Sequence, residues 1–244
     1  MHVLRISISW QITTDEQREG ERNGFMRYVN DAIKKHDTPK DEQINRIIEL
    51  EWTMFDQVTN TGGRAACQDD EWTFYVMRFS QFSAFDESVL QSYEQDLLQA
   101  QQEGRNVVTE KYGYMMEYTD PAYFDQKLKP VLPQISAAKG ELVDRIVNLL
   151  LGFEKVFDQR YPALYSRSRP LQGAQAGNVS FHLYTIGELK TYSRRTLEIY
   201  YRQLAGIDPQ DEKNSPSFVI HRMTTAFYGY ASLEEAETRI RNGQ

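Results

Sequence analysis

The sequence contains a single cysteine, Cys67, and only four histidines. One cysteine excludes an internal disulfide, and so few thiols and imidazoles leave no Cys/His cluster with the spacing of a zinc site. His182 and Glu188 are nearly two helical turns apart, which is not the paired spacing that di-metal carboxylate centres use. We therefore expect a protein of the cytoplasm, a reducing compartment, and the sequence identifies neither a metal site nor a cofactor.

Long hydrophobic runs and an excess of positive charge are also missing. The longest apolar stretch lies around residues 146–153, well short of the roughly 20 residues that a membrane-spanning helix needs. Residues 1–12 are apolar but are interrupted by Arg5, and no small-residue cleavage site follows them, so we expect no export signal. A net charge of −7 argues against binding to a nucleic-acid backbone. Neither a membrane nor a nucleic acid is an expected partner.

The 244 residues fit one domain. Apolar residues recur at helical spacing along most of the chain, and the Pro- and Gly-rich stretch 161–177 is expected to be a long surface connection. The expected helices cover residues 25–33, 41–58, a segment beginning after Asp69 or Asp70, then 86–104, 107–118, 135–157, 179–205, 216–230 and a short one after Ser232. This pattern predicts an all-α, single-domain helical bundle or irregular helical domain of about eight helices over residues 23–244. Residues 1–22 are expected to be a leader that need not be ordered.

The densest polar stretch of the sequence begins with Glu51, continues through Asn60 and Arg64, and ends with Gln68 and Asp70. Two adjacent glycines inside it let backbone N–H groups approach an anion closely, and the helix that follows adds partial positive charge. We expect a small molecule with a carboxylate or phosphate to dock there. The spacing matches no phosphate-loop motif. The alternative is that the glycines end a helix while Arg64 pairs with a nearby aspartate.

Two later polar blocks carry further candidates. In the first, Glu110 and Tyr114 are about one helical turn apart, so one helix face presents both, with Tyr112 between them. The alternative is that this face is solvated. In the second, Lys190 stands beside Tyr192 in an amphipathic helix, where burial would lower the pKa of the lysine and make it a general base or an anion anchor.

These blocks together carry a family resemblance. They read Glu49-Leu50-Glu51-Trp52, Asn60, Gly62-Gly63-Arg64-Ala65, Cys67-Gln68-Asp69-Asp70, Thr73-Phe74, Met77-Arg78, Ser80-Gln81-Phe82, Glu110-Lys111-Tyr112, Met115-Met116 and Gly187-Glu188-Leu189-Lys190-Thr191-Tyr192. From about residue 43 to 230 the chain resembles bacterial proteins of domain-of-unknown-function family 4125, and the first two blocks are the specific part. The resemblance implies a bacterial cytoplasmic domain and carries over no catalytic residue. It favours a functional loop around residues 60–70, because the recognisable residues there are polar.

The first functional hypothesis is an enzyme or binding protein for a small, polar, anionic metabolite, such as an amino acid, acting by metal-free acid/base chemistry as a lyase or hydrolase. We expect the catalytic residues to be Glu51, Asp70, Tyr112 and Lys190. We expect the substrate-binding residues to be Asn60, Arg64, Gln68, Arg78, Glu110 and Tyr192.

Two other functions fit the same residues. One is a helical interaction or regulatory module without catalysis, which an exposed apolar patch and the absence of a pocket near the glycines would favour. The other is a metal oxygenase that uses carboxylate ligands, for which the glutamates are present but the histidine spacing is not. The sequence does not set the oligomeric state.

Overall fold

The computed structural model describes residues 38–59, 63–175 and 178–243. The expected leader over residues 1–22, the expected helix over 25–33 and Asn60 lie outside the described residues. The described elements are α2 (Pro39–Asp56), the 3-10 helix η1 (Ala66–Asp69), α3 (Glu71–Ser83), α4 (Glu87–Gln102), α5 (Val107–Thr119), α6 (Pro121–Tyr123), the π-helix η2 (Phe124–Leu128), α7 (Ala137–Arg160), α8 (Pro162–Tyr165), β1 (Ala174–Gln175), β2 (Asn178–Val179), α9 (Phe181–Thr191), α10 (Arg194–Ala205), α11 (Pro216–Phe227) and α12 (Leu233–Arg241). The all-α prediction is confirmed, although the described residues form eleven α-helices rather than about eight.

Several helices begin at caps that the sequence predicts. The Asp70 side chain accepts the backbone N–H of Thr73 at 3.0 Å and caps α3. Ser232 accepts the backbone N–H of Glu235 at 3.2 Å and caps α12. Each cap satisfies one of the N–H groups that a helix leaves without an internal partner at its start, which fixes where the helix begins.

The prediction of one helix over residues 179–205 is wrong. The chain is extended at Tyr192, where φ is −68° and ψ is 148°, and α9 and α10 are separate. The cause is tertiary, because Asp96 on α4 accepts both the backbone N–H of Ser193 at 2.8 Å and the hydroxyl of Thr196 at 2.7 Å. The start of α10 therefore has two causes: the local cap by Ser193, which accepts the backbone N–H of Thr196 at 3.1 Å, and a carboxylate from another helix, which the local sequence does not reveal.

The expected surface connection over residues 161–177 is also partly wrong. It contains the short helix α8, and Tyr161 and Tyr165 at its ends are buried in a second core beside α7, α11 and α12. The carboxylate of Glu237, on α12, accepts the backbone N–H groups of Ala163 at 3.1 Å and Leu164 at 2.7 Å. A negative charge at the start of α8 thus fixes a segment that composition alone assigns to a loop.

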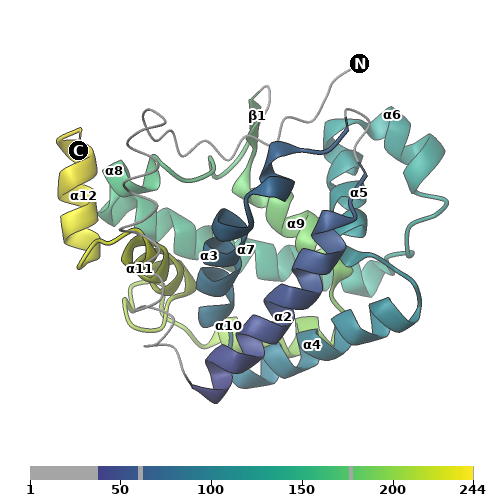
Figure 1. The fold of residues 1–244 in the computed structure, drawn as a ribbon, viewed down its shortest axis with the longest axis horizontal. Helices are drawn as coiled ribbons and strands as arrows, with labels where there is room; N and C mark the ends of the chain where they lie inside the picture. Colours follow the sequence, from purple (N-terminus) through teal and green to yellow (C-terminus); the bar gives the residue numbers. More distant parts are fainter. Residues whose placement is uncertain (1–37, 60–62, 176–177, 244) are drawn as a thin grey trace.

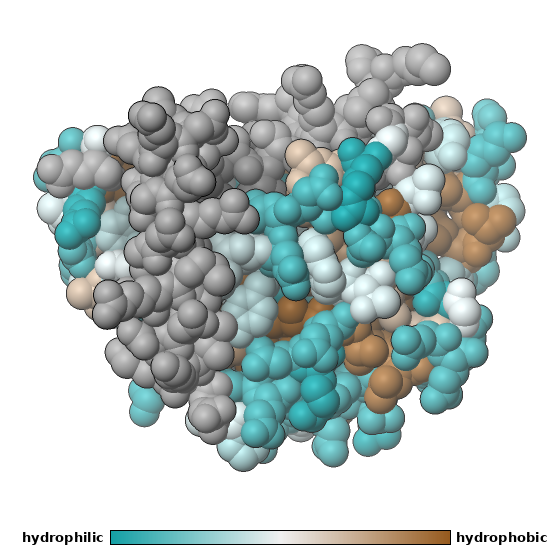
Figure 2. All heavy atoms as spheres, viewed as in Figure 1, coloured by the Kyte–Doolittle hydropathy of each residue, from teal (hydrophilic) through white to brown (hydrophobic). Residues whose placement is uncertain are grey.

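Two helices organise the main core. In Figure 1, α2 crosses the front of the molecule and contacts α3, α4 and α5, while α7, the longest helix described, lies behind it and contacts α9, α10 and α11. Figure 2 shows that hydrophilic side chains cover most of the described surface in this view, with smaller apolar patches between them. In the part of the chain described, no helix is both long and apolar enough to cross a membrane.

Helices α5 and α9 make the most extensive helix-to-helix contact in the described structure. Their closest approach is at Gly187, where a Cβ atom would lie 2.5 Å from Cγ of Met115 and 2.9 Å from the carbonyl oxygen of Lys111. The methionine side chain is able to move, but the carbonyl belongs to the backbone of α5. Glycine is therefore required here by space.

We expect Gly187→Ala to lower the free energy of unfolding by about 1–3 kcal/mol, because the added methyl group overpacks the contact between α5 and α9. Gly152→Ala on α7 is the matched control, since nothing lies within 4 Å of the position of its Cβ. Gly152→Ala is expected to raise the free energy of unfolding by at most about 1 kcal/mol, because alanine has the higher helix propensity. Urea denaturation of both variants measures the difference, and equal stability of the two would contradict the steric argument.

Candidate functional site

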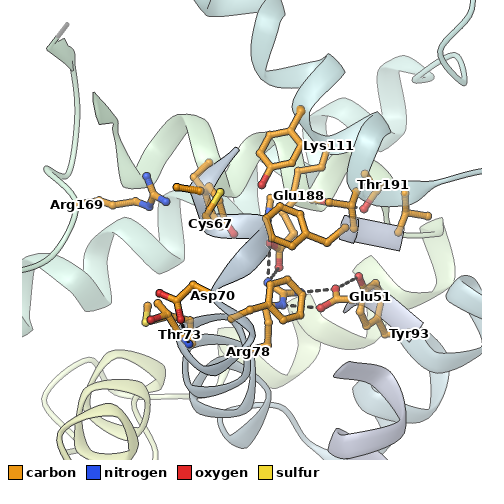
Figure 3. A pocket seen from close by; sticks show the side chains of 18 residues that line it. Glu51, Cys67, Asp70, Thr73, Arg78, Tyr93, Lys111, Arg169, Glu188 and Thr191 are labelled. Carbon is orange, nitrogen blue, oxygen red and sulfur yellow. Dashed lines mark hydrogen bonds and ion pairs between the residues drawn. The ribbon is translucent and has the colours of Figure 1, made fainter. Parts of the chain in front are cut away.

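A cavity of about 460 Å³ lies between α2, α3, α5 and α9 (Figure 3). One part of its wall is apolar and includes Phe55, Phe74, Met77, Val107 and Val108. The rest of the wall carries charged and hydroxyl-bearing side chains from the same helices. A mostly apolar cavity of this size with a few polar groups is typical of sites for small molecules.

The charged part of the wall is a buried cluster centred on Arg78. Its Nε and Nη2 donate to the two carboxylate oxygens of Glu51 at 2.6 and 2.5 Å, and its Nη1 donates to Glu188 at 3.0 Å. Glu188 also accepts from Nζ of Lys111 at 2.5 Å. The four side chains are at most 9% exposed, so they form a chain of alternating charges removed from bulk water.

Neutral side chains complete the cluster, and one of them, Tyr93, also lines the cavity. The Tyr93 hydroxyl donates to Glu51 at 2.6 Å, and the Tyr192 hydroxyl donates to Glu188 at 3.1 Å. Gln81 donates its amide N–H to Glu188 at 2.5 Å. Every carboxylate oxygen therefore has at least one donor, which is the condition under which buried charges are tolerated.

The cluster holds its members in their charged or donor states. Burial disfavours the ionised form of Glu188, but Arg78 and Lys111 outweigh it and hold the pKa of this carboxyl well below its usual range. Burial likewise opposes the charge of Arg78, yet Glu188 and Glu51 raise the pKa of the guanidinium well above its usual value. Burial and the neighbouring carboxylate raise the pKa of Tyr192, so its hydroxyl stays protonated and able to donate.

A second cation, Arg169, lines the cavity from the segment after α8. Its Nη1 donates to the backbone carbonyl of Val179 at 3.2 Å, and the guanidinium lies 4.6 Å from the ring centre of Tyr184. The ammonium of Lys111 lies 3.5 Å from the centre of the same ring. Within the described ranges Arg169 forms no ion pair, whereas Arg78 and Lys111 each face a carboxylate. Arg169 is thus the cavity cation with charge to offer a ligand.

Two weakly acidic groups lie beside Arg169. Burial raises the pKa of Tyr112, and the nearby Tyr184 and Cys67 raise it further, so its hydroxyl stays protonated. Burial also raises the pKa of the Cys67 thiol. At neutral pH both groups are therefore mainly uncharged hydrogen-bond donors, and the small thiolate fraction of Cys67 makes it a slow nucleophile.

The structure brings together four of the residues that the sequence proposes. These are Glu51, Asp70, Arg78 and Tyr112, and all of them line the cavity. Two others lie next to its wall without lining it. Tyr192 supports Glu188 from behind, and Gln68 is buried at the end of α2, where its amide donates to the carbonyl of Phe55 at 2.9 Å.

Three other expected site residues, Arg64, Glu110 and Lys190, do not line the cavity. Arg64 is on the surface and pairs with Asp56 at 2.6 Å and Asp69 at 2.7 Å, the pairing with a nearby aspartate that the alternative interpretation expects. Glu110 is bound by Arg105 at 2.8 Å. Lys190 pairs with Glu117. These three side chains already have partners of opposite charge, which explains why they do not face the cavity.

Sequence reasoning gave no role to Lys111, Glu188, Arg169 or Tyr184. The sequence does contain a sign that Lys111 and Glu188 are buried. Each is a charged residue at a position where helical periodicity places an apolar residue. On α5 the buried residues Val107, Val108 and Met115 flank Lys111. Arg169 had no such signal, since it lies in a segment without periodicity.

The carboxylates at the cavity already have nitrogen donors as partners. Among the described residues there is no group of three or more His, Cys, Asp or Glu side chains placed to hold a metal ion. A metal at Glu51 or Glu188 would have to displace Arg78 or Lys111 from oxygens that they occupy.

We expect Arg78→Met to lower the free energy of unfolding by about 3–5 kcal/mol, because Glu51 loses the one cation that pairs with it among the described residues and both glutamates remain buried. The matched control is Arg46→Met, which removes an exposed ion pair with Glu94 and should cost about 1 kcal/mol or less. If Arg78→Met does not fold, Arg78→Lys replaces it as the test. Lysine keeps the positive charge but not the bidentate geometry, so the free energy of unfolding should fall by less than in Arg78→Met. Equal effects at Arg78 and Arg46 in chemical denaturation would contradict the structure.

We expect the stabilisation by Glu188 to vanish in acid. The pKa of Glu188 is lower in the folded chain than in the unfolded chain, so the stabilisation is complete above the ordinary carboxyl pKa of about 4.3 and is lost as the pH falls toward the native value. The stability difference between the wild type and Glu188→Gln should therefore shrink as denaturation is repeated at pH values below about 5. Glu49→Gln, at an exposed site on α2, controls for loss of one negative charge. A difference independent of pH would refute this role.

Comparison with known proteins assigns the chain to a family. No curated protein and no solved structure matches the chain. Residues 41–238 match the family described as "Protein of unknown function (DUF4125)". This range includes every helix that lines the cavity and extends a little beyond residues 43–230, over which the resemblance was predicted. The chain belongs to the DUF4125 family.

Proposed function

We propose that the chain binds a small anionic metabolite with an apolar body in the cavity between α2, α3, α5 and α9. The observation that carries the proposal is Arg169, a cavity-lining guanidinium without an ion-pair partner in the described structure. The formal charges of the buried cluster cancel, since Arg78 and Lys111 face Glu51 and Glu188. Arg169 then attracts the anionic group of a ligand.

The ligand's two ends would meet different parts of the wall. Near Arg169, the protonated hydroxyl of Tyr112 is a second donor to an anionic group. Elsewhere in the lining, Phe55, Phe74 and Met77 offer apolar surface, which favours an apolar body through burial. This division supports one anionic group on an otherwise apolar molecule.

Binding has more support than proton transfer through Glu51. That carboxylate accepts three hydrogen bonds, two from Arg78 and one from Tyr93, and taking up a proton would weaken all of them. A lyase or hydrolase activity is a second proposal, which rests on Asp70 as the cavity carboxylate without a bound cation in the described ranges.

A role as an interaction module has less support. The cavity is lined by Ala66, Cys67 and Asp70, which directly follow the glycine segment where that hypothesis expects no pocket. The large exposed apolar residues described are Tyr118, Tyr123 and Val131. A cytoplasmic location and a bacterial source stay predictions from the sequence.

The proposal is tested with Cys67, which lines the cavity and is the only cysteine in the sequence. We expect 3-phenylpropanoate to slow alkylation of Cys67 by N-ethylmaleimide and to raise the melting temperature, because it fills the cavity and binds only the folded chain. The neutral 3-phenylpropanol should protect less. Arg169→Gln should weaken protection by 3-phenylpropanoate about tenfold or more, the effect of losing a charged hydrogen bond.

The control variant is Arg167→Gln, two residues away, because Arg167 is exposed and does not line the cavity. It should leave protection by 3-phenylpropanoate unchanged. Equal protection by the acid and the alcohol, or equal weakening in both arginine variants, would overturn the anion site.

A further inference from the structure

Asp70, like Asp69, is exposed, but it also lines the cavity, and no ion pair of the described structure matches its charge. Its Oδ1 accepts the backbone N–H of Thr73 at 3.0 Å, and no lysine, arginine or histidine of the described chain forms an ion pair with it. The adjacent Asp69 differs, because Arg64 binds it at 2.7 Å. Arg64 also binds Asp56, so this surface cation is already engaged and does not neutralise Asp70.

Asp70 and Arg169 belong to the same side of the cavity. Figure 3 shows both on the side of Cys67, with Glu51, Arg78 and Tyr93 lying farther from Arg169. Although their charges are opposite, Asp70 and Arg169 do not pair with each other in the described structure. Opposite charges that line one cavity but do not meet leave a gap that a molecule with both charges bridges.

We infer that the ligand is a zwitterion with an apolar side chain, namely an α-amino acid whose carboxylate lies at Arg169 and whose ammonium lies at Asp70. This inference rests on the proposed anion site and adds the second charge. The apolar wall at Phe55, Phe74 and Met77 takes the side chain. Binding energy then comes from the carboxylate, from the ammonium and from the buried apolar side chain. A ligand that lacks one of these three groups loses only the contribution of that group.

The test compares four probes in the Cys67 protection assay and in titration calorimetry. These are L-phenylalanine, N-acetyl-L-phenylalanine, 3-phenylpropanoate and 2-phenylethylamine. The second and third lack the ammonium, and the fourth lacks the carboxylate. We expect L-phenylalanine to bind about tenfold more tightly than each of the others, since each lacks one charged contact.

The decisive variant is Asp70→Asn, because asparagine caps helices about as well as aspartate and should preserve α3. It should remove the advantage of L-phenylalanine over 3-phenylpropanoate while leaving the affinity for 3-phenylpropanoate unchanged. Asp69→Asn, at the neighbouring exposed aspartate, is the matched control and should keep the full advantage.

The outcomes separate this inference from the proposal beneath it. If 3-phenylpropanoate binds in an Arg169-dependent way but L-phenylalanine binds no better, the zwitterion is wrong and the anion site stands. If the advantage of L-phenylalanine survives in Asp70→Asn, the ammonium is not at Asp70 and the inference fails. If none of the four probes binds, both the inference and the anion site are overturned.

Discussion

The guanidinium of Arg78, bound between Glu51 and Glu188, is the interaction on which the rest of the structure depends. Through it and its partners, five helices meet at one buried point, because Glu51 is on α2, Arg78 on α3, Tyr93 on α4, Lys111 on α5 and Glu188 on α9. Buried ions are costly to desolvate, and apolar residues of similar size often stabilise a core as well or better. Stability alone does not explain such a cluster, whereas its place in the wall of a cavity gives it a further use.

The cluster makes the cavity polar on one side without leaving that side strongly charged. The paired ions hold their hydrogen-bond donors and acceptors in fixed directions, so a ligand meets a wall that is already arranged. Arg169 and Asp70 differ from this cluster because neither has an ion partner in the described chain. The cavity wall therefore contains two kinds of charge: those that pair with one another in the cluster, and those that the proposed function assigns to a ligand.

Much of the helical architecture could be predicted from the sequence, because capping residues and apolar periodicity act locally. Asp70 at the start of α3 and Ser232 at the start of α12 are examples. The break between α9 and α10 has only part of its cause in the local sequence, since Ser193 caps α10 but the carboxylate of Asp96 that holds Ser193 and Thr196 comes from α4. Which distant residue approaches a helix end is decided by packing.

The candidate site shows the same contrast between what the local sequence indicates and what packing decides. Polar blocks pointed to Glu51 and Arg78, which line the cavity, but they gave equal weight to Arg64, which Asp56 and Asp69 engage at the surface, as the alternative interpretation expected for a nearby aspartate. A charged residue within an apolar helical stripe is a better indicator, because it is buried with the stripe and must find a partner. Glu51 on α2 and Lys111 on α5 both fit that pattern.

The close contact at Gly187 limits how the cavity is able to change shape. Lys111 touches Gly187 through its backbone carbonyl and binds Glu188, the next residue, through its side chain. Steric contact and ion pairing thus act on the same turn of each helix, and sliding α5 along α9 would disturb both at once. These two helices form a wall with a fixed register, and Arg78 ties α3 to α9 as well, so in the proposed function adaptation to ligands of different size falls to side-chain rotation.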